Sequence, residues 1–466
     1  MISLCLAALL AAAPQGPPAP WLMVVPAPQR TLPRLPRFLD WAALPAPELT
    51  AERATRRGMA VLGLDPLSPA ALSKAGIDGE KALLVWFDPD RDFSITELAV
   101  RDSAQAERFI AGVAGRVPRA RHLKGGFIAG EHLASALAVV LGGDRLWVLL
   151  GGAYTPSLDP RPPPSSLSTE LEKETIAQPL LIAQRYKRPV LSKSLSGAAD
   201  PELWGALSLP GAIQRIDWAV ELGADALNEA NAFRMRAELD FGPESGLALG
   251  EGLASRGKRG TLPSAALVRG ATAAADLRLV LTGVGLASIL DRAGLPKTAA
   301  KCFTGVVELL LTPSGGLAAF AELVPKPDRA LLSGLSKALA ERYPGATTKT
   351  IGGPRSAVFA AWVGEVSAEA LGDAIAPAVS KGAPALGSAG ATSRAPVELI
   401  AAPTRLFSAL KARSGTPDRL GPRAMDLMML RFVLRPWFDG TQSVRGALLL
   451  PDGRPRLELE VVLVPR

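Results

Sequence analysis

The residues best suited to holding a metal ion are three aspartates at alternate positions between two apolar runs. Asp88, Asp90 and Asp92 offer the hard carboxylate oxygens of which Ca²⁺ takes about six to eight. An EF-hand loop, however, needs a glycine where Phe93 stands and a closing glutamate where Ala99 stands. These aspartates are therefore a candidate calcium site without the full motif, and a polar hairpin tip is the favoured interpretation.

A serine and a lysine three residues apart are the second candidate for chemistry. Ser408-Ala-Leu-Lys411 matches the S-x-x-K motif of serine acyl-enzymes, in which an amine helps to activate the hydroxyl. The accompanying S-D-N and K-T-G motifs are absent from the sequence, and about one S-x-x-K match is expected by chance. A hydrolase that uses Ser408 and Lys411, or carboxylates dispersed along the chain, is therefore an alternative hypothesis.

Histidine and cysteine occur too rarely to suggest a metal centre. His122 and His132 are the 2 histidines, and no spacing places two imidazoles on one helical face, so a zinc site lacks ligands. Cys5 lies in a segment that is lost if a leader is cleaved, which leaves Cys302 without a disulfide partner. The apolar residues after Cys302 indicate a buried, unreactive thiol.

Glycine-rich cofactor loops are incomplete in this sequence. The doublets Gly250-Glu-Gly252 and Gly283-Val-Gly285 never extend to G-x-G-x-x-G after a strand, and neither a P-loop nor a G-x-S-x-G elbow occurs. Both doublets continue as Leu-Ala-Ser, an echo that we interpret as coincidence in an alanine-rich chain. We therefore predict no cofactor.

The composition is that of a globular protein with a basic balance. The 466 residues are 48% apolar, which suffices for about two to four domains with buried cores. The net charge of +8 would suit nucleic acid or an anionic surface, but few aromatic residues lie between the basic groups for base stacking. The densest groups are Arg30, Arg34 and Arg37; Arg53, Arg56 and Arg57; Arg116, Arg119, Arg121 and Lys124; and Arg256, Lys258 and Arg259. Solvated loops are the favoured interpretation, and a basic nucleic-acid or anionic-surface binder is a further alternative.

The first residues resemble a secretory leader. Ile2–Ala13 is an uninterrupted run of apolar and small residues that ends in three alanines, although no basic residue precedes it and Pro14 follows directly. No later segment has the roughly 18 apolar residues of a spanning helix. We expect a periplasmic or secreted protein without a transmembrane helix after the leader, and a cytoplasmic one if the leader is not functional.

Proline-rich and small-residue stretches divide the chain into segments. The expected order is a candidate signal peptide (1–13), a Pro-rich extended arm (14–50), a first α+β lobe (51–154), a Pro-rich linker (155–168), a helical segment plus a strand (169–260), a second α+β lobe (261–375), a linker (376–397), and a C-terminal helix with a separate set of strands (398–466).

Local patterns predict helices at several places. Ser68-Pro69 begins a short helix that Gly76 ends, and Asp102 begins another. Further helices are expected over Thr169–Tyr186, Ile213–Asn231 and Pro403–Ala412 from capping residues or helical periodicity.

Strands are predicted where apolar residues alternate or form short runs. Those expected are 83–87, 93–100, 137–141, 146–150, 233–241, 428–434, 444–450 and 457–464, with hairpin turns at 88–92 and 142–144. Strands and helices mix without a regular βαβ rhythm, so the predicted fold class is α+β with antiparallel sheets and packed helices.

The order of signals also repeats. Leu72–Ile77 and Leu290–Leu295 end helices with Ala-Gly, and Phe93–Val100 and Leu317–Val324 follow as matching strands that lead into a second helix. Two related lobes, produced by internal duplication and followed by C-terminal strands, are the economical interpretation.

The stretches Gly63–Pro69, Ala75–Asp78 and Ala99–Asp102 resemble those of uncharacterised bacterial cell-envelope proteins, which carry a leader, a G-L-D-P…G-I-D stretch and a V-x-D helix start. The resemblance covers about a quarter of the chain. It implies an exported protein and transfers no activity or site residue. We expect a non-enzymatic protein that binds or scaffolds another component of the cell envelope.

Overall fold

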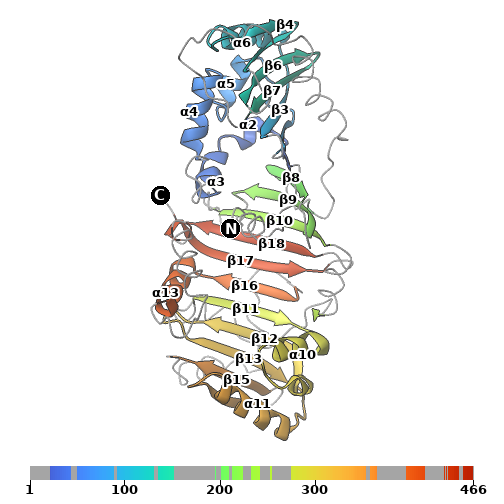
Figure 1. Ribbon diagram of the computed structural model, residues 1–466, viewed down its shortest axis with the longest axis vertical. Helices are drawn as coiled ribbons and strands as arrows, with labels where there is room; N and C mark the ends of the chain where they lie inside the picture. Colours follow the sequence, from blue (N-terminus) through green and yellow to red (C-terminus); the bar gives the residue numbers. More distant parts are fainter. Residues whose placement is uncertain are drawn as a thin grey trace. The chain divides into compact units, whose positions relative to one another are not determined.

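The computed structural model describes residues 21–42, 50–88, 92–130, 135–151, 195, 201–208, 213–223, 232–241, 252–253, 274–352, 357–364, 395–414, 435, 437, 439–450 and 455–464. These residues form mostly antiparallel sheet with some helices, broadly an α+β fold (Figure 1). The chain divides into two compact units, Met1–Ala237 and Glu238–Arg466, called the first and second unit below.

The first unit contains an antiparallel sheet. Its strands are β1 (Trp21–Val25), β2 (Leu83–Asp88), β3 (Phe93–Ala99), β4 (Arg121–Leu123), β5 (Gly126–Ala129), β6 (Leu137–Gly142), β7 (Arg145–Gly151), β8 (Leu203–Ser208) and β9 (Ile213–Leu222). They pair in the order β4-β5-β6-β7-β3-β2-β1-β8-β9. The boundary between the units falls in β10 (Ala232–Phe241), which pairs with β9.

The helices described in the first unit are α2 (Pro28–Thr31), α3 (Leu35–Ala42), α4 (Ala51–Val61), α5 (Pro69–Lys74) and α6 (Ser103–Ala114). Three of them, α4, α5 and α6, begin at a capping side chain. The side chain of Ser68 accepts a hydrogen bond from the N–H of Ala71 at 3.3 Å, and that of Asp102 from Gln105 at 3.0 Å. Both predicted helix starts are therefore confirmed.

The second unit contains a sheet of its own. Its strands are β11 (Ala275–Val280), β12 (Phe303–Leu311), β13 (Leu317–Leu323), β14 (Thr347–Gly352), β15 (Ala357–Val363), β16 (Val397–Ala401), β17 (Thr441–Leu449) and β18 (Arg456–Leu463). They pair in the order β14-β15-β13-β12-β11-β16-β17-β18. Because β16 pairs with β11, the C-terminal strands extend this sheet instead of forming the separate set expected from the sequence.

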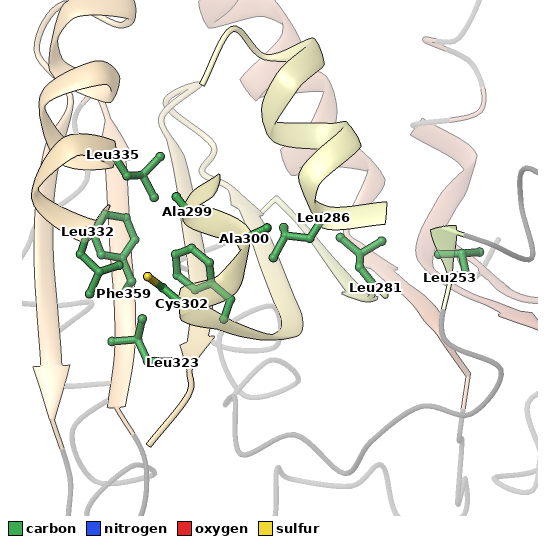
Figure 2. Packing of buried hydrophobic residues seen from close by; sticks show 11 residues of the cluster. Leu253, Leu281, Leu286, Ala299, Ala300, Cys302, Leu323, Leu332, Leu335 and Phe359 are labelled. Carbon is green, nitrogen blue, oxygen red and sulfur yellow. The ribbon is translucent and has the colours of Figure 1, made fainter. Parts of the chain in front are cut away.

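Helices cover one face of the second sheet. They include α10 (Gly283–Arg292), the 3-10 helix η3 (Lys297–Cys302) and α11 (Arg329–Arg342); α13 (Pro403–Ser414) packs against β17. Figure 2 shows Leu332 and Leu335 of α11 beside Phe359 of β15, with Cys302 and Leu323 in the same buried cluster. The opposite face holds a second apolar cluster, which includes Val280, Val306, Leu310, Phe320 and Val358.

The two units share a strand order. In the first, the run β6-β7-β3-β2-β1-β8-β9 has β1 as the earliest strand and a helix, α6, after β3. In the second, the strands of β14-β15-β13-β12-β11-β16-β17 follow one another along the chain in the same order, with α11 after β13; β4 and β5, which lie between α6 and β6, have no counterpart between α11 and β14. Each strand of one run therefore has a counterpart in the other, and all neighbours are antiparallel.

The buried side chains show which residues of β3 correspond to which residues of β13. The buried side chains of β3 and β13 follow one spacing: Phe93, Ile95 and Leu98 in β3, and Ala318, Phe320 and Leu323 in β13. The alignment of Phe93–Val100 with Leu317–Val324 is thus wrong by one residue, because side chains alternate between faces and a one-residue shift exchanges them. The corrected register matches Phe93 with Ala318, which also aligns Glu97 with Glu322.

The two Ala-Gly helix ends have the same local geometry but different places in the fold. Gly76 and Gly294 have left-handed φ angles of +79° and +72°, and the N–H of Ile77 and of Leu295 each donates to the carbonyl five residues earlier. Ile77 then forms a bridge with Val100, whereas η3 follows Leu295. This part of the predicted alignment does not join equivalent positions.

Two further expectations differ from the structure. Ile213–Leu222 is strand β9, not the start of a helix over Ile213–Asn231, because its β-branched and aromatic residues fit a sheet and β8 supplies the paired backbone. The arm expected over 14–50 contains β1, α2 and α3, since prolines are tolerated in the first turn of a helix, as at Pro28.

Several predicted segments lie outside the described residues. They are the leader at 1–13, the linkers 155–168 and 376–397, the helix at Thr169–Tyr186 and the strand at Met428–Leu434. The hairpins β2–β3 and β6–β7, the strand β10, the helix α13 and the strands β17 and β18 agree with the sequence predictions.

Candidate functional site

Four charged residues lie together on the second sheet, on the face opposite the helices α10 and α11. Asp276 and Arg278 are two residues apart on β11 and therefore point to the same face. Arg278 stands opposite Glu308 of β12 on one side and Glu398 of β16 on the other. The antiparallel register of three neighbouring strands thus assembles the cluster from segments that are distant in sequence.

The two acidic residues at the centre are almost fully buried. Asp276 and Glu308 each keep 2% of their surface exposed, and the apolar neighbours Val280, Val306 and Phe320 belong to the same face. Arg278 forms an ion pair with Glu398 at 3.7 Å. Burying an ionised carboxylate raises the free energy of the folded state unless a nearby cation and hydrogen bonds compensate the charge. Whether Asp276 and Glu308 are protonated therefore depends on the groups around them.

Burial raises the pKa of both acids. The pKa of Asp276 increases from 3.8 to about 6, chiefly through loss of solvent, while the hydrogen bond with Glu308 and the charge of Arg278 oppose the increase. The pKa of Glu308 lies well above its ordinary value because of burial and the adjacent Asp276. Glu398 adds to the rise at both groups.

The raised pKa values of Asp276 and Glu308 are those of two carboxyl groups that share a proton. Protonated Glu308 donates to the Asp276 carboxylate, and this single proton spares the interior a second negative charge. Apart from the Glu308 carboxyl, no donor among the described residues meets either carboxylate oxygen of Asp276. The pair therefore binds and releases a proton, and its burial closes it to a substrate from solvent in this conformation.

The first unit has apolar residues at the corresponding positions. Trp86 pairs with Ile95 on one side and Leu22 on the other, just as Glu308 pairs with Phe320 and Arg278. Ala206 stands opposite Leu22 where Glu398 stands opposite Arg278. The same strand order is thus compatible with an apolar cluster, so the charged cluster is a property of the second unit and not a requirement of the fold.

Sequence analysis did not single out this cluster. Asp276 and Arg278 alternate with Leu277 and Leu279, a pattern that is typical of a half-exposed strand with its charges in solvent. Glu308 lies within an apolar run, Val306–Leu311, and one buried acid there was the available signal. Only the pairing of β11 with β12 and β16 shows that the acids share one face.

The predicted calcium ligands lie at the β2–β3 hairpin. Asp88 ends β2, Asp92 is exposed in the turn with a left-handed φ of +49°, and Asp90 lies outside the described residues. Among the residues that the structure describes, no group of three or more His, Cys, Asp or Glu side chains gathers in a way that could hold a metal ion.

Ser408 and Lys411 lie on α13, and both side chains are exposed. The hydroxyl of Ser408 donates to the carbonyl of Thr404 at 3.1 Å, one helical turn earlier. This bond is the ordinary one of a serine within a helix.

The thiol of Cys302 is 1% exposed in the cluster shown in Figure 2, and its Sγ donates to the carbonyl of Asp328 at 3.6 Å. The prediction of a buried thiol is confirmed. His122 is exposed on β4, opposite Phe127, and His132 lies outside the described residues.

One arginine from each of three basic groups contacts another residue of the first unit. Arg34 pairs with Glu202 at 3.0 Å, and Arg56 with Glu52 at 2.6 Å. Arg116 donates to the carbonyl of Leu62 at 3.4 Å. The group Arg256, Lys258 and Arg259 lies outside the described residues.

Gly252 and Gly285, one glycine from each doublet, lie close together. The N–H of Thr282, which caps α10, donates to the carbonyl of Gly252 at 3.0 Å, and Leu253 forms a bridge with Leu281. A Cβ on Gly285 would lie 2.0 Å from the Gly252 oxygen, so the approach requires glycine. Gly252 and Gly285 therefore have a packing role at the start of α10.

None of the helices in the described ranges has both the length and the apolar character needed to cross a bilayer. Comparison with known proteins identifies no relative: no protein-family model, no curated protein and no solved structure matches the chain.

Proposed function

We propose that the protein is a non-enzymatic binding or scaffold protein of the cell envelope, built from two duplicated α+β units. The observation that carries the proposal is the shared strand order, in which β6-β7-β3-β2-β1-β8-β9 corresponds to β14-β15-β13-β12-β11-β16-β17. Repeated units of one architecture present related surfaces twice, which suits the binding of an extended or repetitive partner.

The roles of the candidate reactive groups support binding over catalysis. Ser408 bonds to the backbone of its own helix, and Cys302 packs in an apolar cluster. Asp276 and Glu308, which have the strongly altered pKa values, are buried within a sheet face. Each of these groups thus has a structural role in the described part of the chain. This supports a hydrolase less well than it supports a binding protein.

The N-terminal sequence supports the proposed envelope location. The apolar run Ile2–Ala13 and the resemblance to cell-envelope proteins both support export, and the partner would then be another envelope component.

Fractionation of native cells, with mass spectrometry of the N-terminus, tests the location. A protein found in the envelope or medium without its first residues supports the proposal, and a full-length protein confined to the cytoplasm contradicts it. Any hydrolytic activity measured with a panel of ester and glycoside substrates would be assayed again in Ser408→Ala. An activity that this substitution abolishes would replace the binding hypothesis with the hydrolase hypothesis.

A further inference from the structure

We propose that the sheet of the second unit is kept closed by protonation of the buried carboxyl groups of Asp276 and Glu308, and that loss of a proton from this pair loosens strands β11, β12 and β16. This inference concerns the conformation of the unit and does not depend on the proposed function.

The charges around the pair are unequal. From β11, β12 and β16 the cluster contains the carboxyl groups of Asp276, Glu308 and Glu398 and the guanidinium of Arg278. With both acids protonated, the Glu398 carboxylate faces the Arg278 guanidinium. Each proton lost from the pair adds a negative charge near the same guanidinium, in a region where Asp276 and Glu308 are each 2% exposed. Water must enter to stabilise the additional charge.

The other neighbours on this face do not remove the imbalance. Phe320 of β13 lies opposite Glu308, and Glu322 further along β13 adds another carboxylate, which accepts a hydrogen bond from Thr304 at 2.7 Å. On β17 the nearest cation by register is Arg445, opposite Ile400 of β16 and therefore one strand beyond the ion pair with Glu398. Arg278 is the described cation directly opposite Glu308.

The first unit provides an internal comparison. Leu22, Trp86 and Ala206 occupy the places of Arg278, Glu308 and Glu398, so that these three positions have no acid to ionise; the position that corresponds to Asp276 lies outside the described residues. A loosening caused by the carboxyl pair must therefore appear in the second unit and be absent from strands β1, β2 and β8.

The direction of the pH effect follows from the pKa of the pair. The folded unit retains a proton that an open unit loses, so opening becomes more favourable as the pH rises through the altered pKa values. An increase from 3.8 to about 6 at Asp276 alone raises the opening equilibrium constant about tenfold between about pH 5 and 7. Glu308 extends the effect to higher pH.

Cys302 offers a reporter of opening in the full chain. In a Cys5→Ser background it is the remaining thiol, and it is 1% exposed immediately before β12. Its rate of labelling by a maleimide, divided by the rate in urea at the same pH, gives the open fraction independently of thiol ionisation. We expect this ratio to rise about tenfold between pH 5 and 7 in the otherwise native chain.

Two variants and a matched control test the cause. Asp276→Asn keeps the shape of the side chain but removes the group whose raised pKa gives the tenfold change, so we expect the change in the labelling ratio to fall below about twofold. Glu308→Gln leaves Asp276 buried and able to ionise, so it should retain most of the change between pH 5 and 7 and remove the further rise at higher pH. Glu97→Gln, at the position of β3 that corresponds to Glu322, removes a carboxylate that pairs with Arg145 in the first unit and should retain the tenfold change.

A labelling ratio that stays flat between pH 5 and 7 in the native chain, or a tenfold change that persists in Asp276→Asn, would overturn the proposal. If the variants do not fold, amide hydrogen exchange of the native chain decides the matter. After correction for intrinsic rates, faster exchange with rising pH in β11, β12 and β16 but not in β1, β2 and β8 supports the proposal, and equal changes in both sets refute it.

Discussion

Replacing Arg278 by methionine tests the electrostatics of the buried cluster most directly. The substitution keeps an unbranched side chain of similar length but removes the positive charge opposite Glu308 and Glu398. The guanidinium lies 3.7 Å from the Glu398 carboxylate, which corresponds to about 4 kcal/mol of attraction at an effective dielectric constant of about 20. The same cation also lowers the pKa of Asp276 and Glu308.

The cost of Arg278→Met should depend on pH. At about pH 8 the variant must hold several carboxylates without their cation, and breaking a buried pair in this way costs about 3–5 kcal/mol. At about pH 5 Asp276 and Glu308 carry protons, so that the main loss is the partly exposed contact with Glu398, which we put at about 1–2 kcal/mol. The difference between the two pH values is the diagnostic quantity.

The native chain itself should lose stability as the pH rises. The folded pKa of Asp276, about 6, exceeds its ordinary value of 3.8, so the folded state binds more protons than the unfolded state between these values. The contribution of Asp276 to the free energy of unfolding of the second unit should be highest below about pH 4. It should fall by about 3 kcal/mol as the pH passes 6.

Urea unfolding followed through Cys302 labelling measures the second unit separately, which matters because a chain with two units need not unfold in one step. Arg56→Met is the control, since the pair of Arg56 and Glu52 is exposed and should contribute less than about 0.5 kcal/mol at either pH. An Arg278→Met cost that is equal at pH 5 and pH 8, or below about 1 kcal/mol at both, would refute the reasoning.

Three further predictions address packing and capping, each measured by thermal or urea unfolding. Gly285→Ala places a Cβ 2.0 Å from the Gly252 oxygen and should cost about 1–3 kcal/mol, whereas Gly283→Ala, with no atom within 4 Å of its Cβ, should be nearly neutral; equal costs would contradict the close approach. Asp328→Ala removes a side chain that accepts from two N–H groups at the start of α11 and should cost about 1 kcal/mol, as should Asp102→Ala at α6; a loss below about 0.2 kcal/mol would show that water replaces the cap. Ile95→Ala and Phe320→Ala should each lower the free energy of unfolding by about 2–5 kcal/mol, because both side chains are buried at corresponding positions. Thr96→Ala should lower it by less than about 1 kcal/mol. Equal losses for Thr96→Ala and Phe320→Ala would instead favour the alignment of Phe93–Val100 with Leu317–Val324.

Much of the local structure could be read from the sequence because short-range chemistry decides it. Ser68 and Asp102 cap helices through their own side chains, and Gly76 closes a helix because glycine adopts a positive φ without strain. The β2–β3 hairpin follows from two apolar runs around a polar turn. These features need no information from distant segments.

The face of a strand was harder to predict, because it depends on register. FSITELAV and LAAFAELV look alike without a shift, yet the buried residues match only when Phe93 is aligned with Ala318. The helix expected over Ile213–Asn231 failed for a related reason, since pairing with β8 favours an extended backbone over the local periodicity.

The sequence alone thus determined the α+β class, the caps, the buried Cys302 and several hairpins, all of which depend on neighbouring residues. Only the tertiary structure brought β11, β12 and β16 together and placed Asp276, Glu308 and Glu398 around Arg278. Sheet pairing joins residues more than a hundred positions apart, and the same acids that appear solvated in a linear pattern become a buried proton-binding pair once their strands are neighbours.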